Sequence, residues 1–162
     1  MGFPAAVLLP FLLAAAPQEA SESPAVHWVS GQELTVEGLA WPEAERGHRW
    51  DRLPARAEAE LRPPLWRLSQ DSAGIALRFV SDADTIHARW TVRRANLAMN
   101  HMPASGVSGL DLYARDATGR WRWVAAGIPG AQQNEKVLVT GMDPGEREYL
   151  LFLPLYNGVE AV

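Results

Sequence analysis

The sequence contains no cysteine, and only one of its 15 Lys and Arg residues is a lysine, Lys136. Without cysteine there are no disulfides, no thiolate nucleophile and no cysteine-ligated zinc. The net charge of −4 does not favour binding to nucleic acid or to an anionic membrane. The apolar fraction of 48% and the charged fraction of 21% are those of a globular protein. We therefore expect one ordered domain, over residues 26–162.

Long hydrophobic runs are also scarce, and the single one lies at the N-terminus. Residues 5–16 (AAVLLPFLLAAA) are too few to span a bilayer and are typical of a signal peptide, with small residues before Pro17 for cleavage. No Lys or Arg precedes the run, so a membrane tether or a buried N-terminal helix is the alternative. We expect residues 1–20 to be a signal peptide and linker, and the protein to be secreted or periplasmic.

Short segments of alternating polarity dominate from Val26 onward. Residues 85–92 give the clearest strand, and they follow the apolar residues 74–80 across a turn, which predicts a hairpin. The residues expected to face inward from 85–92 are Ile86, Ala88, Trp90 and Val92. A second hairpin is predicted for residues 110–115 and 120–125, around the turn Asp-Ala-Thr-Gly. Its second strand is expected to turn Trp121 and Trp123 to the core.

Further strands are predicted at residues 136–140 and 147–155, with one or two more within 28–36. The apolar end of the chain, residues 150–156, is expected to form an interface strand. The helix candidate is residues 54–61, ended by Pro63 and Pro64, with a solvated loop as the alternative. Seven to nine short antiparallel strands with little helix predict an all-β fold, a β-sandwich or jelly roll, with a barrel as the alternative.

A search for catalytic motifs finds no complete one. The nucleophile motif G-x-S-x-G fails because Leu110 occupies its last position, and Asp71-Ser72 is interpreted as a turn. The four histidines show no metal-ligand spacing, so we expect neither a metal nor a cofactor. His101 lies between two methionines and is expected to be a half-buried loop residue, or to line a cleft or interface.

Asp111 and Tyr113 alternate with leucines at the start of a predicted strand, directly after a loop rich in Gly and Ser. A carboxylate there can accept backbone N–H groups of that loop, residues 104–109, and so fix its shape. Tyr113 is expected to cover the same loop. We expect these two residues to brace the loop and to take no part in acid–base chemistry.

Residues 99–113 (MNHMPASGVSGLDLY) resemble the signature of the GxDLY domain, which lies upstream of SGNH (GDSL-like) hydrolase domains in secreted bacterial esterases. Three further stretches strengthen the resemblance: residues 50–54 (WDRLP), 121–124 (WRWV) and 153–159 (LPLYNGV). The resemblance implies a β-sandwich that packs on a following α/β hydrolase domain. That domain carries the Ser, His and Asp and acts on esters, including acetyl groups of plant cell-wall sugars.

No position of this sequence matches the catalytic block of that family, so no catalytic residue is assigned here. A hydrolase domain is expected downstream of Val162, and the chain is interpreted as a fragment, a truncated product or an excised domain. The residues expected to face this partner, or to shape the loop that does, are Asn100, His101, Ser105, Gly106, Ser108, Gly109, Asp111, Tyr113, Tyr156 and Asn157.

Three hypotheses follow. In the first, the chain is the accessory N-terminal domain of an exported SGNH-type esterase that acts on an acetylated polysaccharide or another ester. In the second, it is a stand-alone carbohydrate-binding β-sandwich, because seven tryptophans could stack on sugars; the alternation of Trp90, Trp121 and Trp123, expected of core residues, speaks against this. In the third, it is an independent hydrolase that uses His101.

Overall fold

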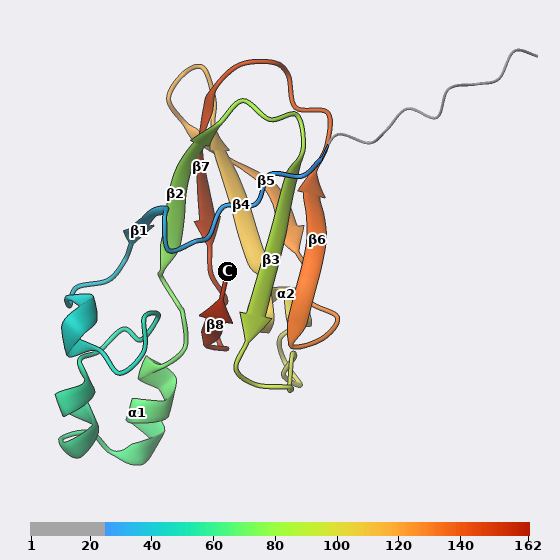
Figure 1. The fold of residues 1–162 in the computed structure, drawn as a ribbon. Helices are drawn as coiled ribbons and strands as arrows, with labels where there is room; N and C mark the ends of the chain where they lie inside the picture. The colour runs from blue at the N-terminus through green and yellow to red at the C-terminus, as the bar shows by residue number, and fades with distance from the viewer. Residues whose placement is uncertain (1–24) are drawn as a thin grey trace, which may run out of the picture.

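The computed structural model describes residues 25–162, which form two antiparallel sheets (Figure 1). The first sheet has the strand order β1-β2-β7-β4-β5 and the second the order β6-β3-β8. The strands are β1 (Thr35–Glu37), β2 (Ala76–Ser81), β3 (Ile86–Val92), β4 (Leu110–Arg115), β5 (Trp121–Gly127), β6 (Gln133–Val139), β7 (Arg147–Phe152) and β8 (Val159–Ala161). The all-β sandwich expected from the sequence is confirmed. The expected signal peptide lies outside the described residues.

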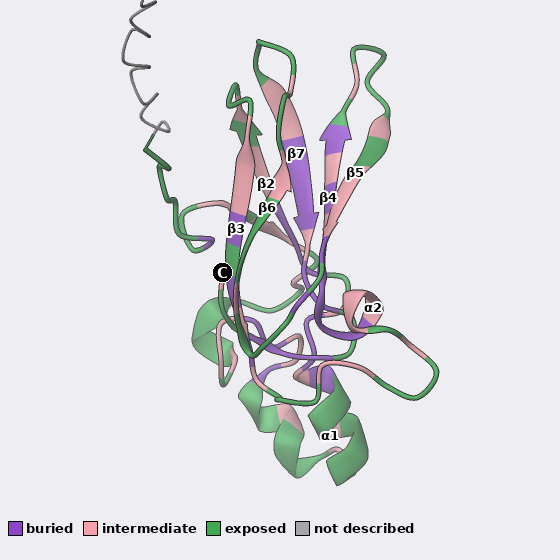
Figure 2. Ribbon diagram, turned by 90° about the vertical axis from the view of Figure 1, so that its right-hand side faces the viewer, coloured by how far each residue is buried: buried purple, intermediate pink, exposed green. Residues whose placement is uncertain are grey.

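The core lies between the two sheets and follows the alternation of the sequence. On β3, Ala88, Trp90 and Val92 are buried while Arg89 is exposed, as predicted. On β4, Leu110 and Leu112 are completely buried. Figure 2 shows the buried stretches of β3, β4 and β7 on the inner strands, and exposed loops at both ends. Alternation therefore identified the buried face of these strands correctly, because a half-buried strand repeats every second residue.

The hairpin predicted for residues 110–125 is confirmed as the pair β4–β5. Its turn closes with a hydrogen bond from the Gly119 N–H to the Asp116 carbonyl, at 2.8 Å. The Asp116 carboxylate accepts from the backbone N–H groups of Thr118 and Arg120, at 2.9 and 3.0 Å. An Asp that begins a turn and a Gly with φ of 81° that ends it explain why this hairpin could be predicted from the sequence.

The other predicted hairpin is wrong. β2 pairs with β1 and β7, whereas β3 pairs with β6 and β8, so the two strands lie in different sheets. The short connection between them carries the chain across the sandwich. Alternation reveals which face of a strand is buried and leaves its pairing partner open, and both strands fit a sandwich core from either sheet.

Trp121 and Trp123 were expected in the core, and this is also wrong. The register pairs Trp123 with Tyr113 and Trp121 with Arg115, on the outer face of the five-stranded sheet, and Trp123 is 58% exposed. A register shift between Leu112 and Tyr113 changes the phase of β5, so that Val124 packs against the core. A bulge of this kind reverses the faces that strict alternation assigns.

Helices are few and short. The helix candidate at 54–61 is a 3-10 helix, η2 (Ala55–Ala59). The two prolines that were expected to end this candidate, Pro63 and Pro64, instead start the α-helix α1 (Pro63–Ser69). Proline suits this place because the first turn of a helix leaves its N–H groups unpaired. Two further elements were not predicted: η1 (Glu43–Glu45) and α2 (Ala104–Ser108). Between residues 25 and 162, every helix is too short or too polar to cross a membrane.

The expected interface strand at 150–156 needs correction. β7 ends at Phe152 and lies in the middle of the five-stranded sheet, paired with β2 on one side and β4 on the other. Leu151 and Leu153 are buried in the core. Within this stretch, only the two residues after Pro154, Leu155 and Tyr156, present large apolar surface to solvent, with exposed fractions of 45% and 41%.

Candidate functional site

The candidate loop, residues 100–109, lies at one end of the sandwich, includes α2 and leads directly into β4 (Figure 2). Its tip is a tight turn in which Met99 and Met102 exchange backbone hydrogen bonds of 2.9 and 3.3 Å. Asn100 and His101 form the tip, and the His101 Nδ1 lies 2.7 Å from the Asn100 Oδ1. Both residues are exposed, so the expectation of a half-buried His101 is wrong.

Gly109 joins α2 to β4 at a point where no side chain fits. A Cβ atom there would lie 2.3 Å from the Ser105 carbonyl oxygen and 2.7 Å from that of Gly127. Gly106 on α2 is similarly constrained, because its Cβ would lie 3.0 Å from the Met102 side chain. The two glycines thus let α2 pack closely against the end of β5 and against the turn of its own loop. The role that the structure gives to Gly109 is therefore close packing.

Ser108 anchors the end of α2 inside the protein. The Trp90 indole N–H, from the three-stranded sheet, donates to the Ser108 carbonyl at 3.0 Å. The Ser108 hydroxyl accepts from the Asn157 Nδ2, also at 3.0 Å. Ser108 and Asn157 are completely buried. A buried polar group needs such partners, because leaving one unpaired costs about 1–3 kcal/mol.

Asn157 also ties the loop to the segment before β8. Its Oδ1 accepts from the Arg94 backbone N–H and its Nδ2 donates to the Arg94 carbonyl, both at 3.0 Å. The neighbouring Tyr156 donates its backbone N–H to the Val107 carbonyl at 3.1 Å. The structure therefore brings Ser108, Tyr156 and Asn157 together, as parts of one assembly with α2.

Asp111 and Tyr113 lie elsewhere, and the predicted bracing of the loop is wrong for both. They point to the outer face of the five-stranded sheet, opposite to Leu110 and Leu112. The Asp111 Oδ1 accepts from the Trp123 indole N–H at 3.2 Å, and no amide of residues 104–109 bonds to it. Tyr113 packs edge-on against Phe152 of β7, with ring centroids 5.6 Å apart. Period-2 alternation could have placed them there, because their neighbours are core leucines.

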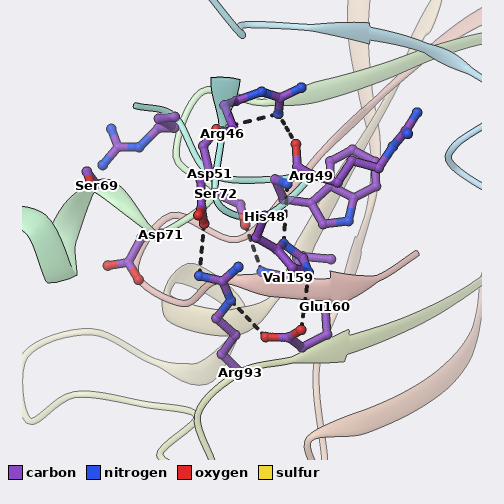
Figure 3. Close-up of polar contacts among 12 residues, drawn as sticks. Arg46, His48, Arg49, Asp51, Ser69, Asp71, Ser72, Arg93, Val159 and Glu160 are labelled. Atoms are coloured by element: carbon purple, nitrogen blue, oxygen red, sulfur yellow. Dashed lines mark hydrogen bonds and ion pairs between the residues drawn. The ribbon is translucent and has the colours of Figure 1, made fainter. Parts of the chain in front are cut away.

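The sequence analysis missed a chain of charged residues: His48, Asp51, Arg93 and Glu160 (Figure 3). The buried Asp51 carboxylate lies 2.9 Å from the Arg93 guanidinium, with which it forms an ion pair. Arg93 donates in turn to Glu160 at 2.8 Å, and Glu160 lies 3.2 Å from the His48 Nε2. This chain ties the residues before α1 to the exit of β3 and to β8.

A second pair of anchors lies beside it. The Arg94 guanidinium donates to the Asp71 Oδ1 at 2.6 Å, and the Ser72 hydroxyl accepts from the Val159 backbone N–H at 2.9 Å. Asp71 and Ser72 do form a turn before β2, as interpreted, since the Ile75 N–H bonds to the Ser72 carbonyl. Their burial was not foreseen. The sequence carries little indication of this burial, because Asp71 and Ser72 lie 23 and 87 residues away from their hydrogen-bond partners, Arg94 and Val159.

These hydrogen bonds and ion pairs hold distant segments of the chain together. None of them joins a serine hydroxyl to a histidine, as a nucleophile and its base would be joined. The buried hydroxyls of Ser72 and Ser108 bond to Val159 and Asn157. The side chains of His48 and His101 contact Glu160 and Asn100 instead of a serine. In the portion of the chain that the structure covers, no group of three or more His, Asp or Glu is placed to hold a metal ion.

The clear pKa shifts lie at the other end of the sandwich. Hydrogen bonds from Arg115 and then Arg78 hold the pKa of Glu148 below its usual value. The Thr118 hydroxyl, Arg122 and the Arg120 N–H lower the pKa of Asp116 strongly. Hydrogen bonds to the carboxylates of Glu37 and Glu148 raise the pKa of Arg78. These groups face solvent near the β4–β5 turn, residues 116–119, at the end of the sandwich that we call the hairpin end. The pKa shifts therefore give no information on the candidate loop.

Comparison with known proteins gives one family and one solved structure. Residues 26–162 match the family model GxDLY, described as the N-terminus of SGNH hydrolase-type esterases. The crystal structure of a protein described as a putative GDSL-like lipase from Bacteroides ovatus is similar, with a TM-score of 0.70 and 32% sequence identity. The match covers 82% of this chain and 38% of that protein, so the chain spans well under half of that protein's length. No curated protein sequence matches the chain.

Proposed function

This chain belongs to the GxDLY family, the N-terminus of SGNH hydrolase-type esterases, and we propose that it serves as the accessory β-sandwich domain of an exported esterase of this type. In this role it packs on the hydrolase domain and helps to shape that domain's substrate cleft. The substrates proposed are acetyl esters of carbohydrates. Export rests on the apolar residues 5–16.

One observation carries the proposal. Three of the four stretches that resemble the family meet at one end of the sandwich: residues 50–54, residues 153–159 and the part of the stretch 99–113 that precedes β4. Contacts join them: the Asn157 Nδ2 donates to the Ser108 hydroxyl, and Asp51 pairs with Arg93, whose backbone N–H donates to the Gly158 carbonyl at 2.8 Å. A fixed surface of this kind supports docking against a second domain, because a partner that meets a preorganised surface pays less in ordering side chains and loops.

The test compares the hydrolase domain of the parent protein with and without residues 26–162. We expect loss of this domain to lower the thermal stability of the hydrolase domain and its activity on p-nitrophenyl acetate and acetylated xylan. Equal stability and equal activity of the two forms would contradict an accessory role. Sequencing downstream of the Val162 codon, for an in-frame Gly-Asp-Ser followed by a helical pattern, identifies the parent.

A second candidate function, a carbohydrate-binding module, gains support from Trp123. In the sequence this residue counted against sugar binding because it was expected in the core. Its side chain is 58% exposed, and its ring N–H is held by Asp111 beside Tyr113. An exposed, fixed aromatic ring can stack on the face of a sugar. Affinity electrophoresis on acetylated xylan decides: retardation of the chain that Trp123→Ala abolishes supports the module, and no retardation contradicts it.

A further inference from the structure

An apolar patch lies next to the candidate loop, on α1 and on the segment before β8. Its members are large apolar side chains with substantial exposure: Leu65 (42%), Leu68 (48%), Leu155 (45%) and Tyr156 (41%). Leu68, Leu155 and Tyr156 line one shallow hollow, together with Arg52, Asp71 and Ala73. Leu65 lies one helical turn before Leu68 and so continues the patch along α1. Side chains from two distant parts of the sequence thus form one surface.

Helix α1 contributes little to the core of this domain. Its sequence is PPLWRLS, yet Ser69 is its only buried residue. A helix of seven residues is not stable by itself, and a surface helix normally turns its apolar side to the core. Two hydrogen bonds from Arg52 hold the C-terminal end of α1. The Arg52 backbone N–H donates to the Ser69 carbonyl at 3.2 Å, and the Arg52 guanidinium donates to the Leu68 carbonyl at 2.5 Å. The apolar residues of α1 therefore remain available to a partner.

Hydrogen bonds hold two of the residues that line the hollow, Asp71 and Tyr156. Arg94 donates to the nearly buried Asp71 carboxylate at 2.6 Å and to the Tyr156 carbonyl at 2.5 Å. Arg94 thus links the Tyr156 backbone to Asp71, two residues after the end of α1. Tyr156 is further held by its N–H on the Val107 carbonyl, at the end of the candidate loop. The patch and the candidate loop are thus parts of one continuous, preorganised surface.

We infer that this patch, Leu65, Leu68, Leu155 and Tyr156, is the surface on which the hydrolase domain of the parent esterase packs; the inference rests on the proposed function. Two observations select this occupant. The matched family is the N-terminal part of its proteins, so the hydrolase domain follows it, and β8, the last strand, begins only three residues after Tyr156. The patch is also continuous with the loop built from the family's signature residues.

The charge around the patch specifies the partner surface further. Two arginines lie at the hollow: Arg52 lines it, and Arg94 donates to the Tyr156 carbonyl. The carboxylate that lines the hollow, Asp71, is already neutralised by Arg94. A complementary face of the hydrolase domain therefore presents apolar side chains at its centre and carboxylates at its rim, the usual arrangement of an apolar core within a polar border.

The experiment uses the full-length parent protein, which carries this chain and its hydrolase domain. Leu68→Asp and Leu155→Asp are compared with Val137→Asp, a matched control whose side chain is 53% exposed on β6, away from the patch. We measure the rate of protease cleavage between the domains and the number of transitions in scanning calorimetry. Both patch variants are expected to raise the cleavage rate about tenfold, the equivalent of about 1.4 kcal/mol, and to split one transition into two. The control is expected to behave like the wild type.

Patch variants that match the control overturn the inference. If deletion of residues 26–162 still destabilises the hydrolase domain in that case, the proposed function stands and only the surface is wrong. If the deletion has no effect either, the proposed function fails with it. Leu68→Ser and Leu155→Ser remove apolar area without placing a charge near Asp71. We expect each Ser variant to raise the cleavage rate less than the Asp variant at the same position. Such a graded effect indicates a lost contact between the domains, whereas a misfolded domain would not follow the size of the change.

Discussion

The two ends of the sandwich are built from different interactions (Figure 1). Within residues 25–162, all the buried polar residues lie at the loop end, around α1, α2 and β8: Asp51, Ser69, Asp71, Ser72, Ser108 and Asn157. At the hairpin end, the ion pairs of Glu148 with Arg78 and Arg115, and of Asp116 with Arg122, are at least partly open to solvent. A buried polar network specifies the local geometry, and loss of one partner is costly because it leaves another buried group unpaired. Exposed ion pairs contribute little to stability. The loop end is thus the end whose shape is specified in detail.

The largest predicted difference compares two arginines of the chain near β3. Arg93→Ala leaves the buried Asp51 carboxylate unpaired, so we expect it to lower the free energy of unfolding by about 3–5 kcal/mol. Arg89→Ala removes an exposed pair with Glu135 and is expected to cost under about 1 kcal/mol. Urea denaturation measures both. Equal losses would show that burial of polar groups does not distinguish the loop end.

A glycine pair tests the close packing of α2. Gly109→Ala forces a Cβ against two carbonyl oxygens that are part of the backbone and cannot swing away, so we expect a loss of about 2–3 kcal/mol. At Gly130 a Cβ would meet no atom within 4 Å, and Gly130→Ala is expected to be nearly neutral. Thermal denaturation compares the two. A neutral Gly109→Ala would mean that the first residue of the GxDLY signature has a role other than packing.

Asn157 tests the hydrogen bonds between the loop and the last segment. Asn157→Ala leaves the Arg94 backbone N–H and carbonyl without their partner, and we expect a loss of about 2 kcal/mol. Asn100→Ala, at the exposed tip of the same loop, is the control and is expected to change stability by less than about 0.5 kcal/mol. The measurement is again urea denaturation. A small effect of Asn157→Ala would show that water replaces these contacts.

The smallest effect concerns the hairpin end and its pH dependence. The pKa of Glu148 is lowered in the folded protein by Arg115 and then Arg78, so its contribution to stability is present above the ordinary pKa of 4.5. That contribution is lost as the pH falls below 4.5 and through the folded pKa. We expect Glu148→Gln to flatten the pH dependence of the unfolding free energy in this range. Added salt should weaken the effect in the wild type, and a salt-independent slope would contradict an exposed pair.

The sequence predicted the sandwich because period-2 alternation records which face of a strand is buried, as on β3 and β4. It did not predict the pairing of β2, since pairing depends on where the chain crosses between sheets. Trp123 was misplaced because one bulge shifts the phase of β5. These errors concern long-range geometry, which local patterns do not contain.

The candidate site was predicted in part. The loop and the LPLYNG stretch were identified through the family resemblance, and the structure joins them through Asn157 and Ser108. Asp111 and Tyr113 were assigned to the wrong face of the sheet. The charged chain from Asp51 to Glu160 was missed because its members come from three distant segments, and none of them forms a local motif.

Hydrogen exchange of the full-length parent protein, compared with this chain alone, tests the central claim most directly. If the loop end packs on the hydrolase domain, amides in residues 63–70, 97–109 and 155–158 become slower to exchange in the full-length protein. Amides in the hairpin turn, residues 116–120, keep the same exchange rate. New protection at the hairpin end or on the outer face around Trp123, without any at the loop end, would contradict the account.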